Sequence, residues 1–376
     1  THNKKVVCVI GGGFGGINVA LQLNQLTNND TEIVLIDPKD EFVFLPLLYE
    51  LTTGMAYKEE VTPRFDVLFK GTKVKHIKGS VSSIDINTKT CIVFTSSGRD
   101  INIYFDQLVL GCGVQPRLDI VPGAAEHAFP FYTSTCALQL KERIKDFKQQ
   151  YNMQELIHII VIGGGCGGVE VAANIAEYFG KDRAKVTIIE RGPMIMRTSA
   201  DNNRDIAERD LKYKGVNIHC NTSVKKIKKD KVQLQELGLN GHKYILPVNL
   251  VILTSGTQAT GLVKSLPLQK DEHDRIIVSP TLQVLEYAYI HALGDCSVMN
   301  NNQTISTFYD FGWKISNILT KTVPKLYEFR YVNLGEMLSL GINNAAVTCL
   351  GGWITLSGPL AVVIRRLVYI YRMPTI

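Results

Sequence analysis

Two stretches of the chain repeat one order of apolar and polar positions. Each begins with an apolar run typical of a strand buried on both faces, and then passes through six residues of which five are glycine. Apolar residues at helical spacing come next, followed by a second apolar run that ends in an acid. The first stretch covers residues 5–37 and the second covers residues 157–190. The pattern predicts a strand, a glycine turn, a helix and a second strand in both places.

The first glycine turn has the spacing GxGxxG. It consists of Gly11, Gly12, Gly13, Phe14, Gly15 and Gly16. Gly11 permits the tight bend, Gly13 lets the backbone approach a pyrophosphate, and Gly16 lets the helix pack closely on the strand. Asp37 ends the second strand 21 residues after Gly16, where it is placed to accept hydrogen bonds from a ribose. We therefore predict that this turn, including Phe14 and Gly15, holds a dinucleotide at a helix N-terminus.

The second turn repeats this spacing with Gly163, Gly165 and Gly168, and Glu190 follows 22 residues after Gly168. A single GxGxxG is a weak signal, because glycine-rich turns without a ligand share it. Two copies, each with its strand, helix and acid, predict two dinucleotide sites. Glu190 favours NADH over NADPH because it would repel a 2′-phosphate, although the adjacent Arg191 could reach toward that phosphate.

Each unit also contains a late apolar strand that runs into glycine, at Gly113 in the first unit and at Gly256 in the second. These glycines are 143 residues apart, close to the 152 residues that separate the two turns. Two homologous Rossmann-like domains of the α/β class explain the spacing. We count Gly113 and Gly256 among the predicted cofactor contacts.

Length, charge and cysteine usage exclude several other classes. A chain of 376 residues is too long for one compact core, and its net charge of +6 is not gathered into a block, so nucleic-acid binding is not predicted. The eight cysteines form neither a CxxC nor a metal-ligand spacing, which disfavours disulfide reduction and a metal site. No apolar run reaches the roughly 18 residues needed to cross a bilayer.

A third motif, residues 281–295, predicts an apolar strand that ends in Gly294 and Asp295. It resembles the second FAD motif of the glutathione-reductase-like flavoproteins, in which the aspartate binds the ribityl chain. The resemblance implies that FAD occupies the first unit, non-covalently and with Asp295 as a ligand. It also implies that NAD(P)H occupies the second unit, which is inserted in the first.

Within those flavoproteins the chain resembles the type II NAD(P)H:quinone dehydrogenases, especially their chloroplast and cyanobacterial branch. The resembling segments are 42–51, 63–65, 121–123, 128–132, 168–170, 333–337 and 356–374. The resemblance implies an enzyme that passes a hydride from NAD(P)H to FAD and two electrons to a quinone. It further implies a peripheral location on a plastid thylakoid membrane, or on the cytoplasmic face of a cyanobacterial or plasma membrane.

The implied domain organisation has four segments. They are the first part of the FAD domain at 1–135, the NAD(P)H domain at 136–265, the second part of the FAD domain at 266–320, and a membrane-associating element at 321–376. A homodimer, or association with a larger membrane complex, is compatible with this organisation.

Three residues are our candidates for the catalytic side of the flavin: Phe44, Tyr49 and Glu170. Phe44, Pro46 and Tyr49 belong to an aromatic loop that could cover a flavin ring, although such a loop is equally typical of core packing. We expect Glu170 in the first turn of the second unit's helix, where the helix dipole stabilises a carboxylate whatever its function. The resemblance places Glu170 near the nicotinamide and quinone side.

The segment 358–371 has apolar residues around Arg365 and Arg366. It is too short to span a bilayer but suits the interface, with both arginines at the headgroups. The alternative is a helix buried against the FAD domain.

One departure from the family concerns the quinone pocket. The family's helix with an Ala-Gln…Gln pattern is replaced by a different sequence at residues 303–313. The candidate donors to a quinone there are Thr304, Ser306, Thr307 and Tyr309, beside the aromatic Phe308 and Phe311. This departure, and termini shorter than those of the family, leave two alternatives open. One is a flavin- or ferredoxin-type reductase with a soluble acceptor, and the other is a flavoprotein kept as a structural subunit.

Overall fold

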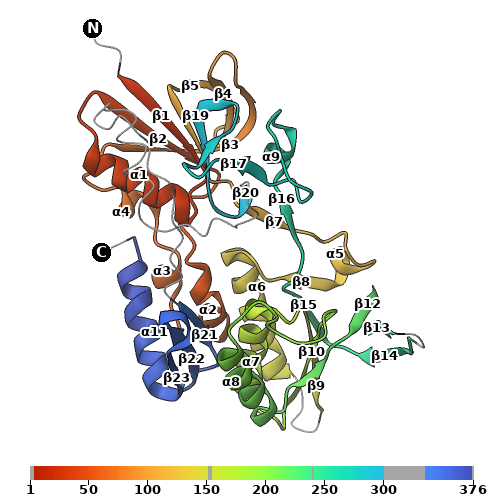
Figure 1. The fold of residues 1–376 in the computed structure, drawn as a ribbon. Coiled ribbons are helices and arrows are strands. Elements are labelled where there is room, and N and C mark those ends of the chain that lie inside the picture. The colour runs from red at the N-terminus through yellow and green to blue at the C-terminus, as the bar shows by residue number, and fades with distance from the viewer. Residues whose placement is uncertain (1–3, 151–154, 239–240, 300–334, 375–376) are drawn as a thin grey trace.

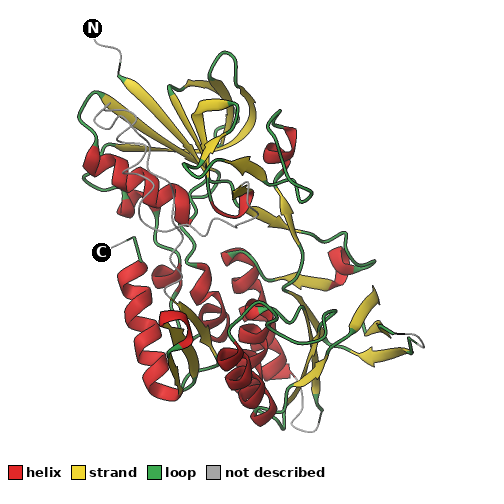
Figure 2. Ribbon diagram, viewed as in Figure 1, coloured by secondary structure: helices red, strands yellow, loops and turns green. Residues whose placement is uncertain are grey.

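The computed structural model describes residues 4–150, 155–238, 241–299 and 335–374. Figure 1 shows a first unit built on a large sheet, a second unit built on a smaller sheet, and a C-terminal unit in which a small sheet carries a long helix. Figure 2 shows helices packed on the faces of both larger sheets. This is the α/β class with two nucleotide-binding units that the repeated pattern predicts.

The first unit contains a ten-stranded sheet of order β20-β17-β18-β19-β6-β1-β2-β3-β4-β5. The strands are β1 (Lys5–Ile10), β2 (Thr31–Asp37), β3 (Val74–Asp85), β4 (Thr90–Thr95), β5 (Asp100–Tyr104), β6 (Gln107–Leu110), β17 (Ile276–Val278), β18 (Gln283–Val284), β19 (Tyr287–Ala292) and β20 (Ser297–Met299). Strands β19, β6, β1, β2 and β3 pair in parallel. Their buried centre explains why the early strands read as continuous apolar runs.

Helical segments of different lengths connect or follow these strands. The helical segments of the first unit are α1 (Phe14–Leu26), η1 (Leu45–Leu47), α2 (Leu48–Thr53), α3 (Lys58–Val61), α4 (Phe65–Leu68) and η2 (Gly294–Cys296). The apolar stretch that begins at 281 forms two antiparallel strands, β18 and β19, instead of a single strand.

The second unit contains a parallel sheet of order β11-β10-β9-β15-β8. Its strands are β8 (Ala128–Pro130), β9 (Ile157–Ile162), β10 (Ala184–Ile189), β11 (Asn217–His219) and β15 (Leu250–Leu253). Its helices are α6 (Ser134–Gln150), α7 (Cys166–Phe179) and α8 (Asp201–Tyr213). A separate antiparallel sheet consists of β12 (Thr222–Ile227), β13 (Lys231–Glu236) and β14 (Lys243–Pro247).

The chain crosses between the two units through an antiparallel pair, β7 (Val114–Pro116) and β16 (Thr257–Ala259). Short helices α5 (Ala124–His127) and α9 (Gly261–Ser265) flank the crossings. Strand β8 belongs to the second sheet although it precedes the expected boundary at residue 136. Ala259 and Val263 pack in the core of the first unit although they precede the expected boundary at residue 266. Both crossings therefore come earlier in the chain than expected.

The C-terminal unit contains a three-stranded antiparallel sheet and one helix. Its elements are β21 (Gly335–Ser339), β22 (Ala345–Cys349), η3 (Leu350–Gly352), β23 (Ile354–Ser357) and α11 (Gly358–Arg372). Ala345 and Val347 of β22 pack against Ala361 and Val362 of α11. Within the described ranges, no helix has the length and apolarity that a membrane crossing requires.

Candidate functional site

The first glycine turn joins β1 to α1, and its geometry depends on the lack of side chains. Gly11 has φ +103°, and a Cβ there would overlap the backbone carbonyl of Gly111. A Cβ on Gly16 would overlap the carbonyl oxygen of Gly11, so the close packing of helix on strand also requires glycine. A Cβ on Gly13 would meet no protein atom within 4 Å. The fold therefore requires glycine at positions 11 and 16, and leaves open space beside position 13.

A cavity of about 360 Å³ lies against this turn, within the size range of ligand pockets. Asp37 lines it, and its Oδ2 accepts the N–H of Gly12 at 2.6 Å while its Oδ1 accepts the N–H of Lys39 at 2.8 Å. The other predicted FAD contacts among the lining residues are Gly11, Gly13, Phe14, Gly15, Gly113 and Asp295. Burial raises the pKa of Asp295. Segments from three distant parts of the first unit thus meet around one cavity.

The second glycine turn repeats the first at atomic level. Gly163 has φ +113°, and a Cβ on Gly168 would overlap the carbonyl oxygen of Gly163. Glu190 accepts the N–H of Gly164 at 2.6 Å, which is the counterpart of the contact between Asp37 and Gly12. Its other oxygen accepts the N–H of Gly192 at 2.5 Å.

Both turns lead into helices whose first N–H groups are open to a ligand. Gly13 and Gly165 occupy the N-cap positions of α1 and α7, and no side chain caps either helix. Neither helix carries an acid in its first turn, so Glu170 lies further along α7 than the sequence predicted. Each helix start therefore presents unpaired donors and a partial positive charge, an arrangement suited to phosphate.

Glu170 lies on α7 where all three units meet. Its side chain is buried, its Oε1 accepts the backbone N–H of Ser339 at 2.8 Å, and Tyr49 of α2 also hydrogen-bonds to it. Burial outweighs these two contacts and raises the pKa of Glu170 to about 8. The Tyr49 ring stacks on Phe131 with centroids 5.8 Å apart. A carboxyl group that is mostly protonated at neutral pH therefore lies next to an aromatic wall.

The aromatic loop of Phe44, Pro46 and Tyr49 contributes one residue to the core and one to the surroundings of Glu170. Phe44 is buried and contacts the ring of Phe14 at 5.1 Å and the ring of Tyr369 at 5.3 Å. Pro46 lies in η1, directly before the helix that carries Tyr49. Burial raises the pKa of Tyr369 to about 12, and Glu170 adds to that shift through its charge. Phe44 thus connects the first glycine turn with the C-terminal helix.

Arg365 corrects one expectation from the sequence. Its side chain is fully buried and forms an ion pair with Glu50 of α2, so it does not face headgroups. Its guanidinium also lies over the Tyr369 ring, 5.0 Å from the centroid. Arg366 is exposed, as expected for an interfacial helix. The helix α11 is therefore anchored to the first unit by a charge on its inner face.

Comparisons with known proteins agree along the whole chain. A family model described as pyridine nucleotide-disulphide oxidoreductase matches residues 5–312. Demethylphylloquinone reductase NdbB of Synechocystis is 36% identical over 386 residues, which cover 100% of this chain and 94% of that protein. The chain belongs to the type II NAD(P)H:quinone oxidoreductases. A second member of this group, the alternative NAD(P)H-ubiquinone oxidoreductase C1, chloroplastic/mitochondrial, of Arabidopsis thaliana, is 32% identical over 416 residues. The match covers 100% of this chain and 79% of that relative.

Solved structures show the same fold. The structure of NDH2 from Plasmodium falciparum in complex with NADH has a TM-score of 0.87 at 18% identity, covering 98% of this chain and 94% of that one. The sulfide:quinone oxidoreductase of Aquifex aeolicus has a TM-score of 0.80 at 21% identity, covering 98% of this chain and 90% of that one. The fold predicted from the two glycine turns is confirmed.

Sequence reasoning on this type II oxidoreductase missed Glu50, Ser339 and Tyr369. Ser339 acts through its backbone N–H, which no residue type reveals. Tyr369 and Arg365 could have been found, because they follow Ala361 at steps of four and share its face of the helix. An arginine on that face indicates a buried partner.

The roles of the other predicted residues stay predictions. Gly256 follows β15, and its carbonyl accepts the N–H of Arg117 in the crossing between units. The candidate quinone donors and aromatic residues at 303–313 lie outside the described residues. The eight cysteines are all free, and the described part of the chain contains no group of three or more His, Cys, Asp or Glu side chains suited to a metal ion.

Proposed function

We propose that this chain oxidises NAD(P)H and reduces a membrane quinone, using FAD held in the first unit. Two relatives that match the whole chain carry names that state this reaction type, a demethylphylloquinone reductase and an NAD(P)H-ubiquinone oxidoreductase. Bound flavin supplies the two-electron chemistry, and the protein supplies binding, orientation and protons.

The two glycine turns fit the two cofactors. The cavity beside the first turn suits FAD: Gly13 leaves space for the pyrophosphate, Asp37 is placed for the adenosine ribose, and Asp295 for the ribityl chain. The second turn suits NAD(P)H, with Gly165 beside its pyrophosphate and Glu190 beside its ribose. Both acids are held in place by backbone N–H groups, and each carboxylate keeps further acceptor sites for ribose hydroxyls.

The buried Glu170 is the observation that carries the acceptor assignment. Reduction of a quinone to a quinol consumes two electrons and two protons. The hydride from NAD(P)H accounts for both electrons and one proton, so a second proton must come from elsewhere. A carboxyl group with a pKa of about 8 holds a proton at neutral pH and can donate it to a quinone oxygen. Tyr49 hydrogen-bonds to Glu170 and stacks on Phe131, so it positions the acid within an aromatic environment.

The C-terminal unit exposes an apolar face suited to a membrane surface. Its exposed apolar side chains are Leu350, Trp353, Ile354, Leu360, Val363, Leu367, Ile370 and Tyr371. Trp353 is 91% exposed, and Arg366 lies among these residues where it can reach headgroups. An acceptor dissolved in the bilayer would then enter beside α11. The relatives from a cyanobacterium and from a plant chloroplast or mitochondrion support a thylakoid location.

Vesicle sedimentation tests the membrane face. We expect the double variant Trp353→Ser with Leu367→Ser to lose binding to vesicles that contain anionic plant lipids. Ile245→Ser provides the matched control, since Ile245 is 55% exposed on β14, outside the C-terminal unit. Equal binding of all three proteins contradicts this attachment.

Stopped-flow reoxidation of the NADH-reduced protein tests the reaction itself. We expect rapid reoxidation by short-chain plastoquinone and naphthoquinone analogues. Reoxidation by ferredoxin with none by either quinone favours a soluble acceptor. Failure of every acceptor with flavin bound favours a structural subunit.

A further inference from the structure

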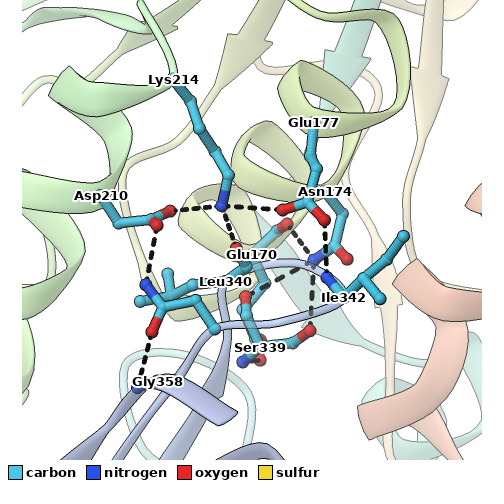
Figure 3. A network of polar contacts seen from close by, with 10 residues as sticks. Glu170, Asn174, Glu177, Asp210, Lys214, Ser339, Leu340, Ile342 and Gly358 are labelled. Carbon is cyan, nitrogen blue, oxygen red and sulfur yellow. Dashed lines mark hydrogen bonds and ion pairs between the residues drawn. The ribbon is translucent and has the colours of Figure 1, made fainter.

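A lysine with a largely buried side chain lies at the centre of a polar network beneath the C-terminal unit. Lys214, directly after α8, is 9% exposed, and its Nζ contacts Asp210 Oδ2 at 2.7 Å and Glu177 Oε2 at 3.0 Å. The same Nζ donates to the carbonyl oxygen of Leu340, as Figure 3 shows. One cation thus joins α7, α8 and the turn at 340–344.

The two acids beside Lys214 also accept hydrogen bonds directly from that turn. Glu177 accepts the backbone N–H of Ile342 at 2.8 Å, and Asp210 accepts the side-chain amide of Asn344 at 2.7 Å. The turn packs so closely that a Cβ on Gly341, which has φ +117°, would overlap the Glu177 carboxylate. Asn344 in turn accepts the N–H of Gly358, the first residue of α11. The turn and the start of α11 are therefore fixed through the same carboxylates.

The residue that contacts Glu170 is the last residue of β21 and directly precedes this turn. Ser339 precedes Leu340 and donates its backbone N–H to Glu170 Oε1 at 2.8 Å, while Asn174 of α7 contacts the Ser339 hydroxyl at 3.3 Å. We propose, resting on the function proposed above, that Lys214 is a positioning residue that holds the 340–344 turn and thereby delivers the Ser339 N–H to Glu170.

The physical reason is the charge balance of the network. Without Lys214, the buried Asp210 and the half-buried Glu177 lose their common cation and repel each other, which releases the turn. The Ser339 N–H lowers the pKa of Glu170, so its loss raises that pKa further. Four other titratable groups interact electrostatically with Glu170. They are Tyr49 from α2, Cys166 from α7, Glu336 from β21 and Tyr369 from α11. None of them contacts Lys214 in the described network.

The test compares Lys214→Met with Lys212→Met, which removes the same charge from an exposed position on α8. In Lys214→Met, we expect the alkaline inflection of quinone reduction to move up by about one pH unit, the scale of a hydrogen bond to a carboxylate. Lys212→Met keeps the wild-type inflection, and Lys214→Arg largely restores it. Flavin reduction by NADH stays within about twofold of wild type in all three.

Infrared difference spectroscopy provides a second readout that does not depend on turnover. The pH titration of the protonated-carboxyl band that disappears in Glu170→Gln follows Glu170 directly, and it shifts upward in Lys214→Met. A wild-type titration in folded, flavin-loaded Lys214→Met overturns the proposal. Should that variant not fold, Asn344→Ala loosens the same turn without removing the lysine. An unchanged Glu170 titration in Asn344→Ala then also overturns the proposal. A wild-type protein that does not reduce quinones contradicts the proposed function, while the infrared titration still decides the role of Lys214.

Discussion

The two nucleotide-binding units share one contact between an acid and a glycine amide but differ around their first glycine. In the first unit, a Cβ on Gly11 would meet the backbone of Gly111, whose carbonyl carbon is only 2.7 Å away. In the second unit, a Cβ on Gly163 would meet side-chain atoms of Ser255 and Thr254 at 2.8 and 2.9 Å. The nearest atom in the first unit is the Gly111 carbonyl oxygen at 2.3 Å, so the overlap there is deeper and involves the backbone that directly follows β6. In the second unit the Thr254 hydroxyl can turn aside, although the Ser255 Cβ cannot. The same motif is therefore less tolerant of change in the first unit.

The helices that follow the two turns differ as well. Glu170 occupies the position in α7 that Asn18 occupies in α1, at the same distance from the first glycine. Asn18 is half-buried and donates to the Phe14 carbonyl within its own helix, while Glu170 is buried and contacts two other units. The repeat thus conserves the means of binding a dinucleotide and changes the residue available for proton chemistry.

The largest effect is expected from alanine at the first glycine of each turn. We predict that Gly11→Ala yields little folded, flavin-containing protein, because a positive φ costs about 1–3 kcal/mol and the overlap with Gly111 adds to it. Gly163→Ala should keep its flavin and lose affinity for NADH. Flavin absorbance per chain and NADH titration measure the two outcomes. Equal flavin content in both variants contradicts the difference described above.

The next effect concerns Glu170. We predict that Glu170→Gln slows quinone reduction by about 100-fold, the usual contribution of a general acid, and leaves flavin reduction by NADH nearly unchanged. In the wild type, quinone reduction should fall as the pH rises through about 8, because the donor form is the protonated one. A pH-independent rate between pH 6 and 10 excludes Glu170 as the donor.

The same residue links stability to pH. Burial raises the pKa of Glu170 from 4.5 to about 8, so the folded chain holds this proton more tightly than the unfolded chain. The stability that the proton confers is complete below pH 4.5 and declines as the pH rises toward 8. Glu170→Gln, which stays neutral, should therefore gain thermal stability relative to wild type above pH 8 and show no such gain at pH 4. Melting curves at both pH values check this.

A smaller effect separates the two cofactors. We predict that Asp295→Ala weakens FAD binding by roughly tenfold or more, the value of one hydrogen bond to a charged group. Glu190→Ala should leave the flavin in place, since Glu190 belongs to the second unit. Flavin retention during gel filtration distinguishes the variants, and a fully loaded Asp295→Ala protein contradicts the role given to Asp295.

The smallest effect concerns the choice of nicotinamide cofactor. We predict that the wild type prefers NADH several-fold in kcat/KM and that Glu190→Gln reduces this preference, because a neutral side chain repels a 2′-phosphate less. Arg191 next to it limits the size of the change. Steady-state kinetics with both donors provide the measurement, and an NADPH preference in the wild type overturns the assignment.

The sequence predicted what is local. The strands, turns and helices around Gly11 and Gly163 follow from glycine spacing and apolar periodicity, and the helix at 358–371 was found nearly to the residue. The crossings between units were misplaced because β8 and β16 have three residues each and carry no periodic signal. The partners of Glu170 and Arg365 could not be found, since their contacts join residues 169 and 315 positions apart.

The ion pair between Glu50 and Arg365 also bears on the order in which the protein becomes complete. The first unit's short helix α2 buries a carboxylate whose cation is synthesised 315 residues later. Both glycine turns can form and bind nucleotides before that cation leaves the ribosome. The surroundings of Glu170, in contrast, lack Tyr369 until α11 docks. We therefore expect a nascent chain to take up flavin before α11 docks, and to reduce quinone only afterwards.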